Sequence, residues 1–153
     1  MKKMTYPSVL SIAGFDGSGG AGIQADLKTI SALGCYATTV LTALPVQNTT
    51  GVKSIFSIPV TVVEEQLKSI FDDILPSAIK IGMVHTPQLV ETIAKSLTEN
   101  PNIPVVFDPV MVATSGHKLI EDPTIKSIVT HLFPLASVIT PNMDEASLLA
   151  KME

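Results

Sequence analysis

Arginine and tryptophan are absent from the 153 residues, and Cys35 is the only cysteine. A single cysteine excludes an internal disulfide and fits a reducing compartment, so we expect a cytoplasmic protein. Because all ten basic residues are lysines, any bound anion must be held by lysine side chains and backbone N–H groups, without a bidentate guanidinium.

Charged residues are also scarce, at 16% of the sequence, and they form no run of one sign. With a net charge of −4, the chain is not expected to bind nucleic acid or an anionic membrane surface. No apolar stretch approaches the roughly 20 residues that span a bilayer. The short apolar run from Val9 to Phe15 lacks the cleavage site of a signal peptide. A hydrophobic content of 46% predicts one compact domain over residues 1–153.

The most informative stretch is the glycine-rich turn from Gly14 to Asp26, G-F-D-G-S-G-G-A-G-I-Q-A-D. It follows a strand-like apolar run, Val9 to Ala13, and precedes helical spacing at Ile23, Leu27 and Ile30. Glycine lets another molecule approach the backbone closely, and the first N–H groups of a helix have no partners within it. We therefore interpret the turn as part of a ligand site, with a purely structural turn as the alternative.

Three glycine-loop chemistries can be compared with this turn. Gly17, Gly19 and Gly22 spell the G-x-G-x-x-G pattern of dinucleotide-binding units. That pattern also needs an acid about 20 residues further on, and no acid occurs between Asp26 and Glu64. A phosphate-binding P-loop needs lysine and then serine or threonine after its last glycine, but isoleucine and glutamine follow here. The third possibility is a turn that holds a small polar substrate, with the Asp26 carboxylate available to it.

Strand-like and helix-like segments alternate through the rest of the chain. After the strand at Val9–Ala13, extended segments are predicted at Tyr36–Leu44, Val52–Ile58, Ala78–Gly82, Val105–Asp108 and Ser137–Thr140, with a polar turn at Gln47–Gly51. Helices are predicted from about Ala21 to Gly34, from a Thr61–Glu64 capping box, from Thr86–Pro87, from Asp122–Pro123 and from Asn142. A loop is predicted from Pro109 to Glu121. This alternation predicts an α/β fold with a largely parallel sheet and helices on both faces.

Ligands of such sheets bind beyond the carboxyl ends of the strands. In this sequence, the rule selects Gly14–Gly20, Pro45–Asn48, Met83–His85, Asp108–Met111 and Pro141–Glu145.

Ordered motifs overlap the same segments. They are S-G-G-A-G-I-Q-A-D-L-K-T (18–29), T-A-L-P-V-Q-N-T (42–49), K-I-G-M (80–83), D-P-V-M-V-A-x-S-G (108–116) and I-T-P-N-x-x-E-A (139–146). In this order they resemble the hydroxymethylpyrimidine and phosphomethylpyrimidine kinases of thiamine synthesis, members of the ribokinase-like superfamily. The resemblance implies ATP-dependent phosphorylation of 4-amino-5-hydroxymethyl-2-methylpyrimidine and then of its monophosphate. Chains of that family continue past the position of Glu153.

The resemblance also implies which parts of a complete enzyme would lie elsewhere. The sequence is expected to be the N-terminal portion of a ribokinase-like domain, truncated at its C-terminus, with the anion hole and catalytic base downstream of Glu153. A homodimer is expected for the full-length protein. The isolated 153-residue chain is expected to be poorly soluble or to self-associate, because an apolar helix face and a strand edge would be uncovered. It is also expected to lack kinase activity, because the glycine turn of the phosphate-binding half would be missing.

The resemblance assigns a pyrimidine site to residues from several motifs: Gly14, Ala21, Asp26, Gln47, Met83 and Val110. The amide of Gln47 can donate and accept together, which suits the edge of an aminopyrimidine, although a turn-forming role is equally compatible with its chemistry. Asp26 would hold the ring, and its alternative is an acid stabilised by the dipole at a helix start. Ala21, Met83 and Val110 would form apolar walls.

A second group of residues points to magnesium and nucleotide. Asp108 ends a buried strand, where an acid is costly unless it is paired or hydrogen-bonded, so a role near Mg²⁺ is favoured over loop capping. Asn142 and Glu145 form a plain helix-capping pattern. The resemblance implies that this pair also orders magnesium waters and the phosphates of ATP, with Asp108 and Glu145 at the metal.

Two other functions fit the same residues. A pyridoxine or pyridoxal kinase also acts on a hydroxymethyl group of a heteroaromatic ring. A truncated, non-catalytic module would keep the pyrimidine pocket and bind the ring without turning over ATP.

Overall fold

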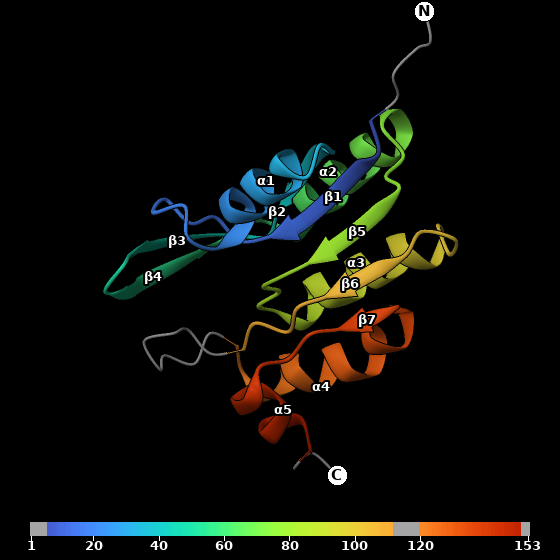
Figure 1. Ribbon diagram of the computed structural model, residues 1–153. Coiled ribbons are helices and arrows are strands. Elements are labelled where there is room, and N and C mark those ends of the chain that lie inside the picture. The colour runs from blue at the N-terminus through green and yellow to red at the C-terminus, as the bar shows by residue number, and fades with distance from the viewer. Residues whose placement is uncertain (1–5, 112–119, 151–153) are drawn as a thin grey trace, which may run out of the picture.

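The computed structural model describes residues 6–111 and 120–150 and consists of alternating strands and helices (Figure 1). In chain order, the elements are β1 (Ser8–Ala13), α1 (Gly22–Ala32), β2 (Tyr36–Leu41), β3 (Ala43–Asn48), β4 (Gly51–Ser57), α2 (Val60–Asp73), β5 (Ala78–Ile81), α3 (Pro87–Thr98), β6 (Val105–Phe107), α4 (Asp122–His131), a 3₁₀ turn (Phe133–Leu135), β7 (Val138–Ile139) and α5 (Met143–Ala150). Gly116, in the predicted loop from Pro109 to Glu121, lies outside the described residues. Within the described ranges, no helix has both the length and the apolar character needed to cross a membrane.

The main sheet has five strands in the order β2-β1-β5-β6-β7, and all of its neighbouring strands run parallel. The order reverses at β1, because the chain first adds β2 on one side and then adds β5, β6 and β7 on the other. Strands β3 and β4 form a separate antiparallel hairpin, which extends beyond the carboxyl ends of the main strands (Figure 1). The predicted α/β fold with a largely parallel sheet is confirmed.

Helices cover both faces of the sheet, and the alternation of side chains along β1 separates the two layers. Leu10 and Ile12 are fully buried in the core cluster that also contains residues of α2, α3 and α4. Ser11, between them, points the other way and hydrogen-bonds to Asp26 of α1. Helix α1 therefore packs on one face over β1 and β2, while α2, α3 and α4 pack on the other. Each fully buried Leu or Ile contributes about 1.5–3 kcal/mol.

The long strand predicted at Tyr36–Leu44 is in fact two strands that belong to different sheets. Thr42 lies between them and is fully buried. Its N–H donates to Ala13 O at 3.0 Å and its hydroxyl donates to Met83 O at 2.8 Å, so it anchors the ends of β1 and β5. The chain then leaves the main sheet as β3, and Gln47 lies in that strand, beside a register shift, instead of in the predicted turn.

Helix ends follow the predicted signals except at α2. Gly34, with φ of 77°, follows the end of α1, and Thr86 caps α3 by accepting a hydrogen bond from Leu89 N at 3.3 Å. The predicted Thr61–Glu64 capping box is wrong, because α2 already begins at Val60 and no side chain caps it. The N–H groups of Val62 and Val63 both donate to the carbonyl oxygen of Pro59, at 2.9 and 3.2 Å, so Thr61 falls inside the first turn.

Candidate active site

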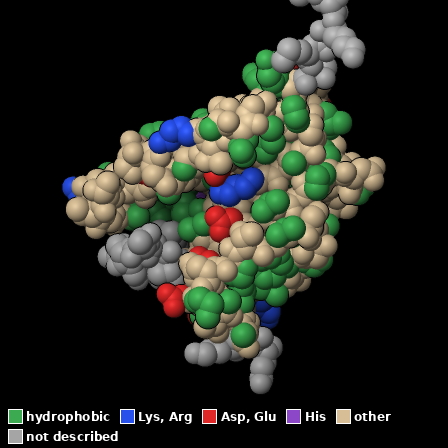
Figure 2. Space-filling model, viewed as in Figure 1, with side chains coloured by type: hydrophobic (Ala, Val, Ile, Leu, Met, Phe, Trp, Pro, Cys, Tyr) green, Lys and Arg blue, Asp and Glu red, His purple; other side chains and the backbone are tan. Residues whose placement is uncertain are grey.

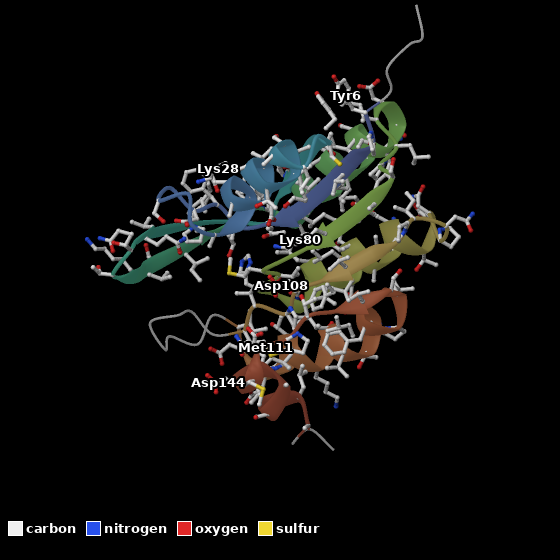
Figure 3. The ribbon with its side chains drawn as sticks, in the orientation of Figure 1. Tyr6, Lys28, Lys80, Asp108, Met111 and Asp144 are labelled. Atoms are coloured by element: carbon white, nitrogen blue, oxygen red, sulfur yellow. The ribbon has the colours of Figure 1, made fainter. Side chains whose placement is uncertain are left out.

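A cavity of about 330 Å³ opens at the carboxyl ends of β1, β5 and β6, between the glycine turn and the β3–β4 hairpin. A lysine and an acidic side chain lie side by side near the centre of the face in Figure 2, where Figure 3 labels Lys80 and Asp108. The cavity is lined by all of the residues predicted for the pyrimidine site, Gly14, Ala21, Asp26, Gln47, Met83 and Val110, together with Lys80 and Asp108. Residues from separate motifs are thus brought to one place.

The glycine turn is folded around the carboxylate of Asp16, which is only 3% exposed. This carboxylate accepts hydrogen bonds from Ser18 N at 3.0 Å, Gly20 N at 3.0 Å and Ala21 N at 2.8 Å, and from the Ser18 hydroxyl at 2.8 Å. Burial opposes ionisation, but hydrogen bonds from Gln47, Ser18 and Ala21 outweigh it and lower the pKa of Asp16 to about 2. The N–H groups of Gly20 and Ala21, just before α1, are therefore already occupied by a carboxylate of the chain itself.

Gly22 allows the start of α1 to lie directly against the end of β1. Its φ is 57°, and a Cβ atom at this position would lie 2.3 Å from the carbonyl oxygen of Gly14. The same oxygen accepts a hydrogen bond from Ile23 N at 2.9 Å. Gly14 is itself tightly packed, because a Cβ atom there would lie 2.8 Å from Cε of Met83. This close packing sets the wall of the cavity.

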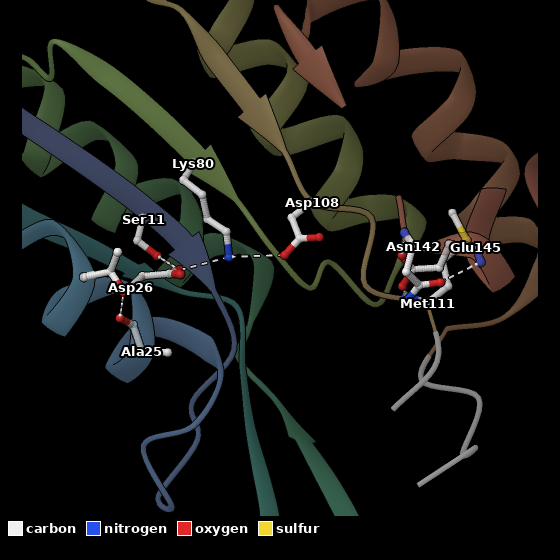
Figure 4. A network of polar contacts seen from close by, with 9 residues as sticks. Ser11, Ala25, Asp26, Lys80, Asp108, Met111, Asn142 and Glu145 are labelled. Carbon is white, nitrogen blue, oxygen red and sulfur yellow. Dashed lines mark hydrogen bonds and ion pairs between the residues drawn. The ribbon is translucent and has the colours of Figure 1, made fainter. Parts of the chain in front are cut away.

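Charged side chains cross the floor of the cavity in a line (Figure 4). Asp26 Oδ2 accepts a hydrogen bond from Ser11 Oγ at 2.6 Å and pairs with Lys80 Nζ at 3.1 Å. Lys80 Nζ also lies 3.8 Å from Asp108 Oδ2. Asp26 lies beyond the first turn of α1, so its partners are Ser11 and Lys80 and not the N–H groups at the helix start. Among the described residues that line the cavity, Lys80 is the only cation.

The carboxyl group of Asp108 is harder to ionise than a free one. Burial raises the pKa of Asp108, and the nearby carboxylates of Glu145 and Asp26 raise it further, against the opposing effects of Lys80 and a hydrogen bond from Thr140. A bound cation would favour the ionised form of this carboxylate, and a carboxylate is a ligand that suits Mg²⁺.

Glu145 and Asn142 form the predicted capping pair of α5. Asn142 Oδ1 accepts from Glu145 N at 2.9 Å, and Glu145 Oε2 accepts from Asn142 N at 2.9 Å. The other oxygen of Glu145 accepts from Met111 N at 3.2 Å, so both carboxylate oxygens of this 4%-exposed side chain are occupied by backbone N–H groups. Neither residue lines the cavity. Glu145 thus ties α5 to the segment that follows Asp108.

The two residues predicted to hold magnesium, Asp108 and Glu145, therefore differ in how well they suit the ion. Asp108 faces the cavity and suits a cation, whereas Glu145 is committed to backbone hydrogen bonds and influences Asp108 through its charge. Within residues 6–111 and 120–150, no group of three or more His, Cys, Asp or Glu side chains is arranged to hold a metal ion. A magnesium ion here would rest mainly on Asp108 and water, which is how this ion usually binds.

Sequence reasoning missed two residues of the site, Asp16 and Lys80. Each had a usable signal. Asp16 stands two residues before Ser18 in a glycine turn, a spacing at which an aspartate commonly accepts local N–H groups. Lys80 is a charged residue within a short strand, where it must have a partner to be buried.

Both the sequence and the fold of this chain are similar to those of known kinases. The family profile of phosphomethylpyrimidine kinase matches residues 16–153. A hydroxymethylpyrimidine/phosphomethylpyrimidine kinase of Streptomyces coelicolor is 46% identical over 146 residues, which are 95% of this chain and 54% of that protein. The chain spans about half the length of this curated relative.

Two solved structures are similar to this fold. The phosphomethylpyrimidine kinase of Clostridium difficile superposes with a TM-score of 0.88 at 41% identity, covering 96% of this chain and 64% of that one. A pyridoxal kinase of Bacillus subtilis, solved as an ADP complex, superposes with a TM-score of 0.84 at 38% identity, covering 97% of this chain and 55% of that one. The sheet and the helices around the cavity are thus shared with kinases of both kinds.

Proposed function

Because the chain belongs to the phosphomethylpyrimidine kinase family, we propose that its full-length protein transfers a phosphoryl group from ATP to hydroxymethylpyrimidine and then to the monophosphate. The observation that carries this proposal is the meeting of the predicted ring-binding residues in one cavity at the carboxyl ends of the strands. A cytoplasmic homodimer remains part of the proposal, as an expectation from the family resemblance and the single cysteine.

The ring would lie between polar ends and apolar walls. Asp26 is held by Ser11 and Lys80, so its carboxylate has a fixed position from which to accept a hydrogen bond from the ring. Gln47 would contact the aminopyrimidine edge from the hairpin, where its side chain is partly buried. Met83 and Val110 provide apolar contacts for the ring faces. Such a site would act mainly by positioning the substrate for reaction, and positioning is a large part of catalysis in phosphoryl transfer.

The nucleotide side would involve Asp108, Asn142 and Glu145. Magnesium, when bound, neutralises the charge that develops on the transferring phosphoryl group. Asp108 would hold the ion, while Asn142 and Glu145 would keep the neighbouring backbone in place through their reciprocal hydrogen bonds. The catalytic base is expected downstream of Glu153.

The proposal is tested by removing the amide of Gln47. In the full-length protein, Gln47→Ala should weaken hydroxymethylpyrimidine binding by about 5- to 150-fold, because a polar edge of the ring is left unpaired, and should leave ATP affinity unchanged. Asn48→Ala is the matched control, since this neighbouring amide hydrogen-bonds to Thr50 and does not line the cavity. Calorimetric titration measures both ligands, and equal pyrimidine affinities in the two variants would remove Gln47 from the site.

Pyridoxal kinase activity is the second candidate, favoured by the similarity to the Bacillus subtilis enzyme. Steady-state kinetics with both rings on the same preparation separates the two. A higher kcat/KM for pyridoxal than for hydroxymethylpyrimidine would replace the proposed substrate with the second candidate. A third possibility is a module that binds the pyrimidine without turnover, and an ADP-release assay on the full-length protein distinguishes it from a kinase.

A further inference from the structure

The cavity has to accept two substrates that differ in charge. In the proposed function, the first substrate is a neutral alcohol and the second is its monophosphate, which is an anion. The carboxylates of Asp16, Asp26 and Asp108 line the cavity, against the single ammonium of Lys80 among the described residues. The neutral ring is indifferent to this balance, but a phosphate group needs a cation or N–H donors to bind.

The other donors near the cavity are already used or lie outside it. The carboxylate of Asp16 takes up the N–H groups of Gly20 and Ala21 in the glycine turn. Lys28, an exposed lysine of α1, hydrogen-bonds to the same turn but does not line the cavity. The sequence contains no arginine. In the part of the chain that the structure describes, only Lys80 brings a positive charge into the cavity.

Lys80 is anchored so that its ammonium reaches the floor of the cavity. Its backbone lies in β5, the central strand of the sheet, between Ser11 of β1 and Val106 of β6. A Cβ atom at Gly82 would lie 3.0 Å from Lys80 Nζ, so the glycine leaves room for the ammonium. The Lys80 side chain is 25% exposed, which allows a ligand to contact it from the cavity.

The ammonium of Lys80 retains donor capacity for a ligand. It has three N–H groups, and Asp26 Oδ2 accepts one of them at 3.1 Å. Asp108 Oδ2 lies 3.8 Å from Lys80 Nζ, which is an ion pair but too long for a hydrogen bond (Figure 4). Ser11 Oγ also holds Asp26, at 2.6 Å, so the partner that positions the ammonium is itself fixed.

We propose that Lys80 is a specificity-determining residue for the second phosphorylation, whose ammonium binds the phosphate group of the hydroxymethylpyrimidine monophosphate. This inference rests on the proposed function, because it requires the monophosphate to occupy the same cavity as the neutral ring. Without the ammonium, the charged groups left around the ligand would be the carboxylates of Asp26 and Asp108, which repel a phosphate. The cavity would then still accept the alcohol and reject the monophosphate.

The test compares the two substrates by calorimetry on the full-length protein without nucleotide. Lys80→Met removes the charge and keeps an unbranched side chain. It should weaken binding of the monophosphate by about 10- to 150-fold, the effect of losing a hydrogen bond to a charged group. Binding of the neutral hydroxymethylpyrimidine should weaken by less than about fivefold, because Ser11 still holds Asp26.

Lys28→Met is the matched control. It changes the net charge of the protein by the same amount, at an exposed lysine that does not line the cavity. It should leave both affinities within about twofold of the unmutated protein, since exposed charges at a distance are screened by salt. Equal loss of monophosphate affinity in the two variants would show a general effect of charge and overturn the inference.

The outcomes are separable from those of the proposed function. Equal weakening of both substrates in Lys80→Met would indicate a structural role and overturn the inference, while leaving the pyrimidine site intact. Should that variant fail to fold, a crystal structure of the unmutated protein with the monophosphate is decisive, because phosphate oxygens beyond hydrogen-bond reach of Lys80 Nζ contradict the inference. Absence of binding of either substrate to the unmutated protein would overturn the proposed function and this inference with it.

Discussion

Replacing Gly22 by alanine isolates the close contact on which the glycine turn depends. Gly22 and Gly34 both have φ in the left-handed region, at 57° and 77°. An alanine at either position costs about 1–2 kcal/mol for its backbone conformation. At Gly34 the added Cβ meets nothing within 4 Å, whereas at Gly22 it would lie 2.3 Å from the carbonyl oxygen of Gly14. Relieving that overlap requires a backbone shift, which costs about 1–3 kcal/mol more.

We therefore expect Gly22→Ala to lower the free energy of unfolding by about 2–5 kcal/mol and Gly34→Ala by about 1–2 kcal/mol. Because the displaced segment includes Gly14, which lines the cavity, the first variant should also weaken pyrimidine binding and the second should not. Urea denaturation followed by circular dichroism measures the stabilities in the full-length protein, and calorimetry measures the binding. Equal destabilisation by the two alanines would show that the overlap with Gly14 is relaxed at no cost and that the turn is not tightly packed.

Other predictions concern the charged groups. Lys80→Met should lower the free energy of unfolding in urea by about 1–3 kcal/mol, because it leaves the Asp26 carboxylate without its cation in a pair whose side chains are only 25% (Lys80) and 16% (Asp26) exposed. Lys68→Met, which breaks the exposed pair with Asp72, should cost far less. Equal losses in the two variants would contradict this account. Because the pKa of Asp16 is lower in the folded state than in the unfolded chain, its ionisation stabilises the fold by about 1–2 kcal/mol at pH values above 3.8, the unfolded pKa. This contribution should disappear as the pH falls from 3.8 through about 2, and acid unfolding of Asp16→Asn should lack that part of the pH dependence. Asp108→Asn should raise the Mg²⁺ concentration needed for half-maximal activity with little change in pyrimidine affinity, and an unaltered metal dependence would place the ion elsewhere.

The order of strands and helices follows from the sequence, but the division of one strand between two sheets does not. Residues 36–44 read Y-A-T-T-V-L-T-A-L, an uninterrupted run of strand-forming residues. Nothing local distinguishes Thr42 from Thr38 or Thr39. Thr42 ends the main-sheet strand because its N–H and hydroxyl reach the carbonyls of Ala13 and Met83, which are distant in sequence. Such a boundary is set by tertiary hydrogen bonds, so local propensity alone cannot locate it.

The candidate site was predictable to the extent that its residues follow strand ends. Gly14, Met83 and Asp108 were found in this way, because parallel strands bring their carboxyl ends to one edge. The sequence could not decide whether Asp26 is a residue of the cavity or an acid stabilised at a helix start. That choice depends on its contact with Lys80, which is 54 positions away in the sequence. Long-range partners of charged groups have no local signature.

At the glycine turn, the prediction of a ligand site rested on an incomplete physical picture. The sequence predicts free N–H groups at the start of the first helix beside a ligand. In the structure, the carboxylate of Asp16 takes up the N–H groups of Gly20 and Ala21 just before α1, and Ile23 N within α1 donates to Gly14 O. An internal anion in this position opposes the binding of a second negative charge nearby. A neutral ring edge is compatible with that arrangement, whereas a phosphate bound directly to these N–H groups is not. These two N–H groups are therefore unavailable to an anion, which agrees with the proposal that the turn contacts the neutral ring and that the phosphates lie toward Asp108.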